Sequence, residues 1–145
     1  MSGFAERTGV HTLASAFDWS SVSTVVDVGG GWGEVSLDLA QRFGHIAFTV
    51  QDLKHVIEGR PACESKDLRS RVEYVEHNFF APQNKEDADV YYFRYIFHNY
   101  PDESCVKLLQ AQIPALKPGA HVLIQDVVIP EPRDVLPAYK EKYRR

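Results

Sequence analysis

Three spaced glycines, Gly29, Gly31 and Gly33, join an apolar stretch to a helical one in "VVDVGGGWGEVSLDLA", residues 25–40. Such a turn lets backbone amides and the positive end of a helix approach a ligand more closely than any side chain would allow. Glu34 stands where the dinucleotide motif G-x-G-x-x-G has its third glycine, and no G-K-[ST] phosphate loop follows. The spacing disfavours NAD and ATP. A tight turn that merely packs the helix on the strand is the alternative.

A carboxylate stands at the end of the second apolar stretch, because Asp52 follows Gly33 by 19 residues. At that place in a parallel α/β sheet, a carboxylate can accept hydrogen bonds from both hydroxyls of a ribose. Taken alone, Asp52 is equally typical of a solvated loop or a helix cap. Together with the glycine turn, it predicts a ligand that contains adenosine.

The elements that must position these groups alternate between β-branched and helical stretches. The strand-like stretches are "VSTVVDV", "HIAFTV", "RVEYVEHNF", "ADVYYF" and "AHVLIQDVVI". Helices are expected over residues 34–43 and 54–58, while residues 59–70 are typical of either loop or helix. Pro101 opens another helix, which Pro114 should tighten at its last turn. The buried stripe predicted for that helix is Val106, Leu109, Ile113 and Leu116. This order predicts an α/β fold, with a mostly parallel sheet covered by helices on both faces.

Composition narrows the class of protein. A chain of 145 residues fits one domain, and a net charge of -4 gives no basic surface for nucleic acid. No apolar run approaches the roughly 20 residues that span a bilayer, and no signal sequence is evident, so a cytoplasmic protein without membrane contact is expected. The two cysteines, Cys63 and Cys105, have neither a disulfide framework nor metal-ligand spacing, and no metal site is expected.

Five segments carry a family resemblance, in order along residues 17–132: "VVDVGGGWG", "VQDLKHVI", "VEYVEHNFFAP", "YYFRYIFHNYPDESC" and "ALKPGAHVLIQDVVIPE". They resemble the successive signatures of S-adenosylmethionine-dependent O-methyltransferases of the plant caffeate and fungal secondary-metabolite type. The resemblance implies a Rossmann-like methyltransferase fold, S-adenosyl-L-methionine as cofactor and a small, phenolic hydroxyl acceptor. In "IFHNYPDE", Asn99 and Tyr100 replace the aspartate and tryptophan of the family's H-D-W-x-D-E element.

The resemblance also implies roles for single residues. His98 would be the general base that removes the acceptor proton, and Asp126, where the family has glutamate, would orient its imidazole. A satisfied core histidine is the alternative for His98. The implied cofactor contacts are Asp27, Gly29, Gly31, Asp52, Asn78, Phe79, Arg94 and Tyr100. Among these, Asp52 would hold the ribose and Arg94 the methionyl carboxylate, whereas core packing is the alternative for Phe79 and Tyr100.

The expected organisation is a leading helix or linker remnant (1–20), a cofactor-binding core (21–132) and a tail (133–145) that begins a further segment. Family members have an amino-terminal dimerisation domain and a sixth and seventh strand. The chain is therefore expected to be a fragment truncated after its fifth strand, which binds cofactor with little or no turnover. Its open fifth strand should favour self-association. The alternatives are a non-catalytic module that binds cofactor or protein and, less favoured, an NAD-dependent oxidoreductase.

Overall fold

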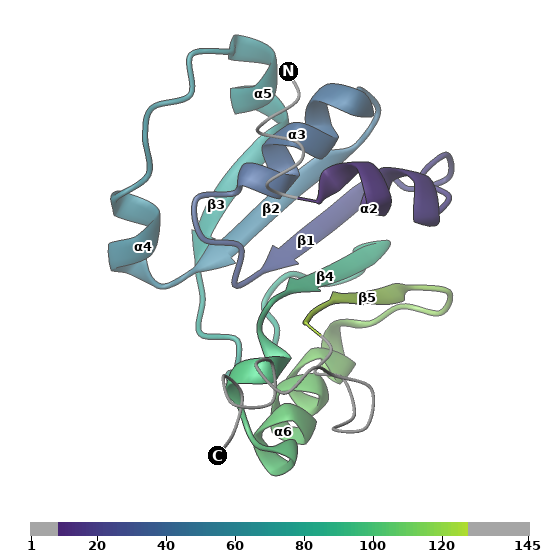
Figure 1. The fold of residues 1–145 in the computed structure, drawn as a ribbon, viewed down its shortest axis with the longest axis vertical. Helices are drawn as coiled ribbons and strands as arrows, with labels where there is room; N and C mark the ends of the chain where they lie inside the picture. Colours follow the sequence, from purple (N-terminus) through teal and green to yellow (C-terminus); the bar gives the residue numbers. More distant parts are fainter. Residues whose placement is uncertain (1–8, 128–145) are drawn as a thin grey trace, which may run out of the picture.

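The five strands form one parallel sheet in the computed structural model, which describes residues 9–127 (Figure 1). The strands are β1 (Thr24–Val28), β2 (Ala47–Asp52), β3 (Val72–Glu76), β4 (Val90–Arg94) and β5 (His121–Gln125). Their spatial order is β3-β2-β1-β4-β5, and every neighbouring pair is parallel. The predicted parallel α/β sheet is confirmed. The predicted tail, the last residues of the core and the first residues of the leading segment lie outside the described residues.

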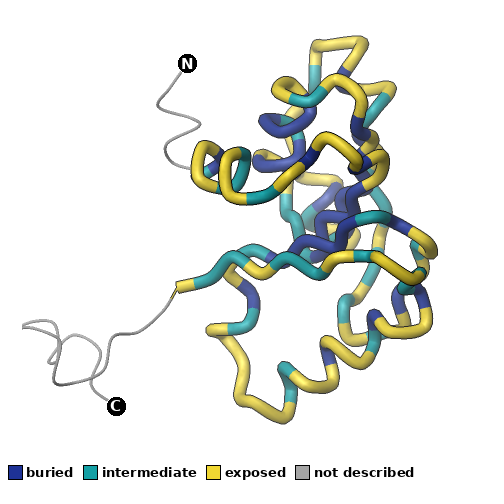
Figure 2. The backbone as a smooth tube through the Cα atoms, turned by 90° about the vertical axis from the view of Figure 1, so that its right-hand side faces the viewer, coloured by how far each residue is buried: buried dark blue, intermediate teal, exposed yellow. Residues whose placement is uncertain are grey.

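Alternate residues of each strand enter cores on opposite faces of the sheet, as the period of a strand requires. Val25 pairs with Phe48 on one side and Val90 on the other, and all three enter the first core. Val26, one residue along, enters the second core with its partner Tyr91. Figure 2 shows buried and half-buried backbone running through the sheet, with most exposed segments in helices and loops.

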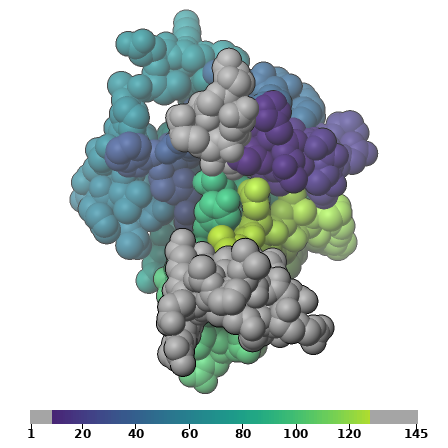
Figure 3. All heavy atoms as spheres, in the orientation of Figure 1, coloured from purple at the N-terminus to yellow at the C-terminus, as the bar shows by residue number. Residues whose placement is uncertain are grey.

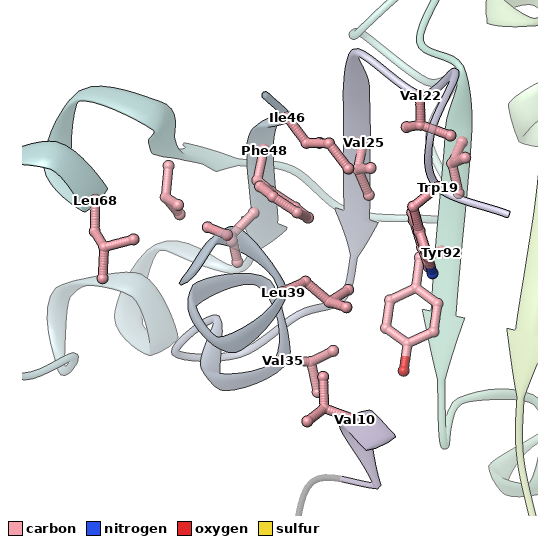
Figure 4. Packing of buried hydrophobic residues seen from close by; sticks show 14 residues of the cluster. Val10, Trp19, Val22, Val25, Val35, Leu39, Ile46, Phe48, Leu68 and Tyr92 are labelled. Carbon is pink, nitrogen blue, oxygen red and sulfur yellow. The ribbon is translucent and has the colours of Figure 1, made fainter. Parts of the chain in front are cut away.

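Helices cover both faces. On the first face lie α2 (Val10–Ala16), α3 (Glu34–Arg42) and α5 (Lys66–Arg71), and on the second lies α6 (Asp102–Gln112). Figure 4 shows Val35 and Leu39 of α3 directed toward the strand residues, with Trp19 and Tyr92 beside them. The predicted helices at 34–43 and 54–58 are confirmed as α3 and α4 (Lys54–Glu58). Residues 59–70 contain a loop and most of α5, whose first turn is capped by the Ser65 hydroxyl, which accepts from Leu68 N at 3.2 Å.

The predicted buried stripe of α6 is wrong. Val106 is 51% exposed and Ile113 61% exposed, whereas Leu108 and Gln112 are buried. Leu109, which is also exposed, and half-buried Leu116 complete the predicted set. In this orientation the buried Gln112 side chain accepts a hydrogen bond from Gln83 Nε2 at 2.9 Å, a polar contact that an apolar stripe does not reveal. The effect predicted for Pro114 is confirmed, since α6 ends at Gln112 and continues as the short 3-10 helix η2 (Ile113–Ala115).

Because all strands run the same way, their carboxyl ends meet at one edge of the sheet, where ligands of open α/β sheets bind. The strand order reverses between β1 and β4. On one side of β1 lie β2 and β3, and on its other side lie β4 and β5. In the space-filling view of Figure 3, the green and yellow-green atoms of the β4 and β5 region lie below α2 and to the right of the α4–α5 segment. Over residues 9–127, no helix is long and apolar enough to cross a membrane.

Candidate functional site

The glycine turn after β1 needs its glycines for more than one reason. Gly29, Gly31 and Gly33 all have positive φ, at 65°, 62° and 76°, a region that residues with side chains rarely adopt. A Cβ on Gly29 would lie 2.8 Å from Cδ1 of Ile96, so the protein's own side chains fill that space. A Cβ on Gly31 would have no atom within 4 Å. Of these three positions, only Gly31 turns its bare side to open space where a ligand could lie.

Asp52 faces the glycine turn and is bonded to it. Its Oδ2 accepts a hydrogen bond from Gly31 N at 2.8 Å, and its Oδ1 accepts one from Leu53 N at 2.7 Å. Gly30 N donates to the carbonyl of the neighbouring Gln51 at 2.9 Å. The end of β2 therefore fixes the turn in place. Each carboxylate oxygen keeps a lone pair that can accept from a ribose hydroxyl.

Asp27 lies beneath the turn as a buried carboxyl group. It is 3% exposed, and its Oδ2 accepts from the Ser36 hydroxyl at 2.7 Å. Burial raises the pKa of Asp27 to about 6, against the opposing effects of the Ser36 hydrogen bond and the positive charge of Arg94. A Cβ on Gly30 would lie 2.5 Å from Cγ of Asp27, which is why this position also requires glycine. The turn thus rests on a carboxyl group whose pKa is raised to about 6 by burial.

Two hollows flank the turn. One, of about 160 Å³, is lined by Asp27, Gly29, Gly30, Gly31, Trp32, Glu34, Val35 and Arg94. The other, of about 270 Å³, is lined by Asp52, Leu53, His77, Asn78, Phe79, Phe80 and Tyr100. A larger hollow of about 560 Å³ lies at the outer side of β3 and α5. We assign the site to the smaller pair, because they adjoin the turn at the strand ends and contain every expected cofactor contact.

Three aromatic rings form a wall of the second hollow. The ring centroids of Phe80 and Tyr100 are 5.3 Å apart, and Phe79 lies 5.1 Å from Phe80 and 6.1 Å from Tyr100, all edge to face. The Asn78 side-chain oxygen accepts from Phe80 N at 2.9 Å, which fixes the start of this segment after β3. Such a wall offers an apolar, aromatic surface to a planar ring. The Asn78 amide and the Asp52 carboxylate line the same hollow.

His98 and Asp126, which are 28 positions apart, meet at the ends of β4 and β5. His98 lies in the short helix η1 (Phe97–Asn99), and its Nδ1 is 2.6 Å from Oδ1 of Asp126. His98 N also donates to Oδ2 at 3.2 Å. Burial raises the pKa of Asp126, but hydrogen bonds from Val127 N, the His98 ring and His98 N outweigh it and hold the pKa below its ordinary value. With Nδ1–H donating to this carboxylate, Nε2 is the nitrogen that can accept a proton.

The sequence did not single out several residues that line the hollows. His77 lines the second hollow together with Leu53 and Phe80, and Trp32 lines the first. Burial lowers the pKa of the His77 imidazole, which favours its neutral form. The available signal for His77 and Phe80 was their position, since both lie within four residues of the end of β3, where a parallel sheet collects its ligand contacts.

Comparison with known proteins gives a consistent result. A family model described as the O-methyltransferase domain matches residues 2–141. O-methyltransferase aoiF of Aspergillus oryzae is 40% identical over a match that covers 97% of this chain and 35% of that protein. The 6-hydroxytryprostatin B O-methyltransferase of Neosartorya fischeri is 41% identical over 123 residues, which cover 85% of this chain and 29% of that protein.

Among solved structures, CalO1, a methyltransferase in calicheamicin biosynthesis in its SAH-bound form, superposes with a TM-score of 0.76 at 28% identity. The match covers 90% of this chain and 39% of CalO1. The chain spans about a third of the length of the curated relatives it matches. The matches extend over almost all of residues 2–141 and include the glycine turn, the strand ends and the His98 segment, and the chain therefore belongs to the O-methyltransferase family.

Proposed function

We propose that this chain is the cofactor-binding part of an S-adenosylmethionine-dependent O-methyltransferase that methylates a hydroxyl group of a small, phenolic metabolite. The observation that carries the proposal is the pair of hollows on either side of the glycine turn, held together by the hydrogen bond from Gly31 N to Asp52. An elongated ligand with a charged end, a sugar and a planar base matches that sequence of surfaces.

The residues of the two hollows fit S-adenosylmethionine. Arg94 lines the first hollow, where a guanidinium suits the methionyl carboxylate, and Asp27 supplies the opposite charge for the ammonium group. Asp52 can accept from the ribose hydroxyls while it holds the turn. In the second hollow, the aromatic wall suits the adenine ring, and Asn78 can meet its polar edge. When bound, the cofactor supplies a methyl group on a sulfonium, which activates that carbon for displacement.

His98 is the residue we assign to proton removal. Arg94, four positions before His98, lines the first hollow, and Tyr100, two positions after it, lines the second, so η1 lies in the segment that connects these two lining residues. With an acceptor hydroxyl held beside the bound cofactor, Nε2 of His98 would take the hydroxyl proton. Asp126 holds the ring through Nδ1 and stabilises the imidazolium that results.

Because the chain spans about a third of the length of its relatives, we assign methyl transfer to a protein of the relatives' full length and cofactor binding to these 145 residues. The phenolic acceptor rests on the family resemblance, and the relative from Neosartorya fischeri, whose name specifies 6-hydroxytryprostatin B, is consistent with a hydroxyl group as acceptor.

Isothermal titration of the 145-residue chain with S-adenosylmethionine and S-adenosylhomocysteine tests the binding part of the proposal. Saturable one-to-one binding is expected. Absence of heat at millimolar ligand, with protein shown to be folded by circular dichroism, would contradict it. Addition of NAD in a parallel thermal-melt experiment separates this proposal from an oxidoreductase, because a ligand bound only by the folded state raises the melting temperature.

A further inference from the structure

Three buried glutamines from three different elements form a chain of hydrogen bonds behind the cofactor hollows. Gln51 is on β2, Gln83 in the loop before β4 and Gln112 at the end of α6, and their exposed fractions are 1%, 5% and 1%. Gln51 and Gln83 form a reciprocal amide pair, with Nε2–Oε1 distances of 2.6 and 3.0 Å. Gln83 Nε2 also donates to Gln112 Oε1 at 2.9 Å.

We call the three residues Gln51, Gln83 and Gln112 the amide chain. All of their side-chain N–H groups have acceptors. The second donor of Gln51 goes to Asn84 Oδ1 at 2.9 Å, and Gln112 donates to Leu108 O at 2.9 Å. Burying an amide is costly unless its hydrogen bonds are made. An interior that only had to be filled would be served by apolar side chains of similar volume, so a fully bonded set of this kind indicates that the positions of its members matter.

Both ends of the amide chain reach a wall of the proposed cofactor site. At the β2 end, the Gln51 carbonyl accepts from Gly30 N at 2.9 Å, and the next residue is Asp52. At the α6 end, Gln112 Nε2 lies 3.4 Å from the carbonyl oxygen of Phe79, in the aromatic wall. Between them, Gln83 N donates to Ala111 O at 2.9 Å and fixes the loop to α6.

We propose that Gln51, Gln83 and Gln112 are positioning residues that set the spacing between the glycine turn with Asp52 and the Asn78–Phe79 wall. This inference rests on the proposed function, because it concerns the site that would hold the adenosine. None of the three side chains lines either hollow. They act through Gly30, which lines the first hollow, and Phe79, which lines the second. The observed orientation of α6, which buries Gln112 rather than the apolar stripe, places Gln112 beside Gln83.

The test is Gln83→Met, which keeps the volume of the side chain but removes its bonds to Gln51 and Gln112. We expect its dissociation constants for S-adenosylhomocysteine and for adenosine to rise together by about 10-fold or more, since small displacements of a binding wall have effects of this size. Gln112→Met, which leaves the Gln51–Gln83 pair intact, is the milder second variant should Gln83→Met not fold. The control is Leu68→Ala, which opens a cavity in the opposite core away from both hollows.

Hydrogen exchange of the free protein supplies a readout that needs no ligand. In Gln83→Met, exchange should rise at Gly30 N and at Ala81 N, which donates to the Asn78 carbonyl at 2.9 Å, by more than in Leu68→Ala, whatever the relative stability of the two variants. Equal dissociation constants for Gln83→Met and the unsubstituted protein, or exchange at these amides that only follows global stability, would overturn the inference. Failure of the unsubstituted protein to bind would instead contradict the proposed function, and the exchange data would still decide whether the amide chain holds the two walls together.

Discussion

Substitution of Asp27 by Asn should stabilise the protein in a manner that depends on pH. Burial raises the pKa of Asp27 from 3.8 to about 6, and a shift of this size corresponds to about 3 kcal/mol of unfolding free energy. The folded state holds the proton more tightly than the unfolded state. The protein is therefore most stabilised by this group below its unfolded pKa, loses that stabilisation as the pH rises from about 4 to about 6, and carries the full cost of the buried charge above that range.

Asparagine keeps an oxygen that can accept from the Ser36 hydroxyl but carries no charge. Asp27→Asn should therefore be more stable than the unsubstituted protein by up to about 3 kcal/mol at about pH 7.5, with the difference shrinking to a small remainder at about pH 4. Urea unfolding of both proteins across this pH range, followed by circular dichroism and extrapolated linearly, measures the difference. The same substitution should weaken binding of S-adenosylmethionine, because it removes the proposed partner of the ammonium group.

Asp89→Asn provides a control of opposite sign. A hydrogen bond from Lys117 lowers the pKa of Asp89 against the effect of burial, and Ser23 N and Thr24 N also donate to it. Its stabilisation is present above its unfolded pKa and is lost as the pH falls through its folded pKa, so this variant should be destabilised at neutral pH and converge with the unsubstituted protein in acid. A stability difference for Asp27→Asn that does not change between about pH 4.5 and about pH 7.5 would refute the reasoning.

Three further predictions follow from the same site. In an enzyme of the relatives' full length, His98→Ala should reduce kcat by about 100-fold or more while the dissociation constant for S-adenosylhomocysteine stays within about 2-fold. A loss of cofactor affinity as large as the loss of kcat would contradict the role of His98 as base. Gly31→Val should cost about 1 to 2 kcal/mol, because its φ of 62° strains any residue with a side chain, and should also weaken cofactor binding; calorimetric melting and titration measure the two effects. Within residues 9–127 β5 is an edge strand, so the 145-residue chain should self-associate through it, and Ile124→Lys, at a position 51% exposed, should reduce this in sedimentation velocity; a monomer at all concentrations would contradict it.

The positions of strands and helices could be predicted closely from the sequence because they depend on local patterns. A parallel strand covered on both faces appears as a continuous β-branched run, and Pro101 and the glycine turn mark where helices begin. The register and order of the strands then followed from the structure alone. The candidate cofactor contacts came from the ends of these strands and from the family resemblance, and the structure gathers them around the two hollows beside the turn.

The orientation of α6 could not be predicted in this way. Its apolar residues at helical spacing favoured one face, but Leu108 and Gln112 are the residues that are buried. The hydrogen bond between Gln112 and Gln83 joins segments 29 positions apart. A pattern that counts only the apolar residues of one helix cannot predict that this polar residue is buried.

The sequence by itself determined the α/β alternation, the glycine turn and the placement of an acid at the end of the second strand, because each depends on residues adjacent in the chain. Only the tertiary structure decided that Asp52 accepts a hydrogen bond from Gly31 and that Asp126 reaches His98. It also decided that the side chains of Ile96 and Phe79 occupy the space that a Cβ on Gly29 would need. The physical reason is that hydrogen bonds and packing contacts between distant segments depend on which strands lie side by side, and that order is set when the whole sheet assembles around its two cores.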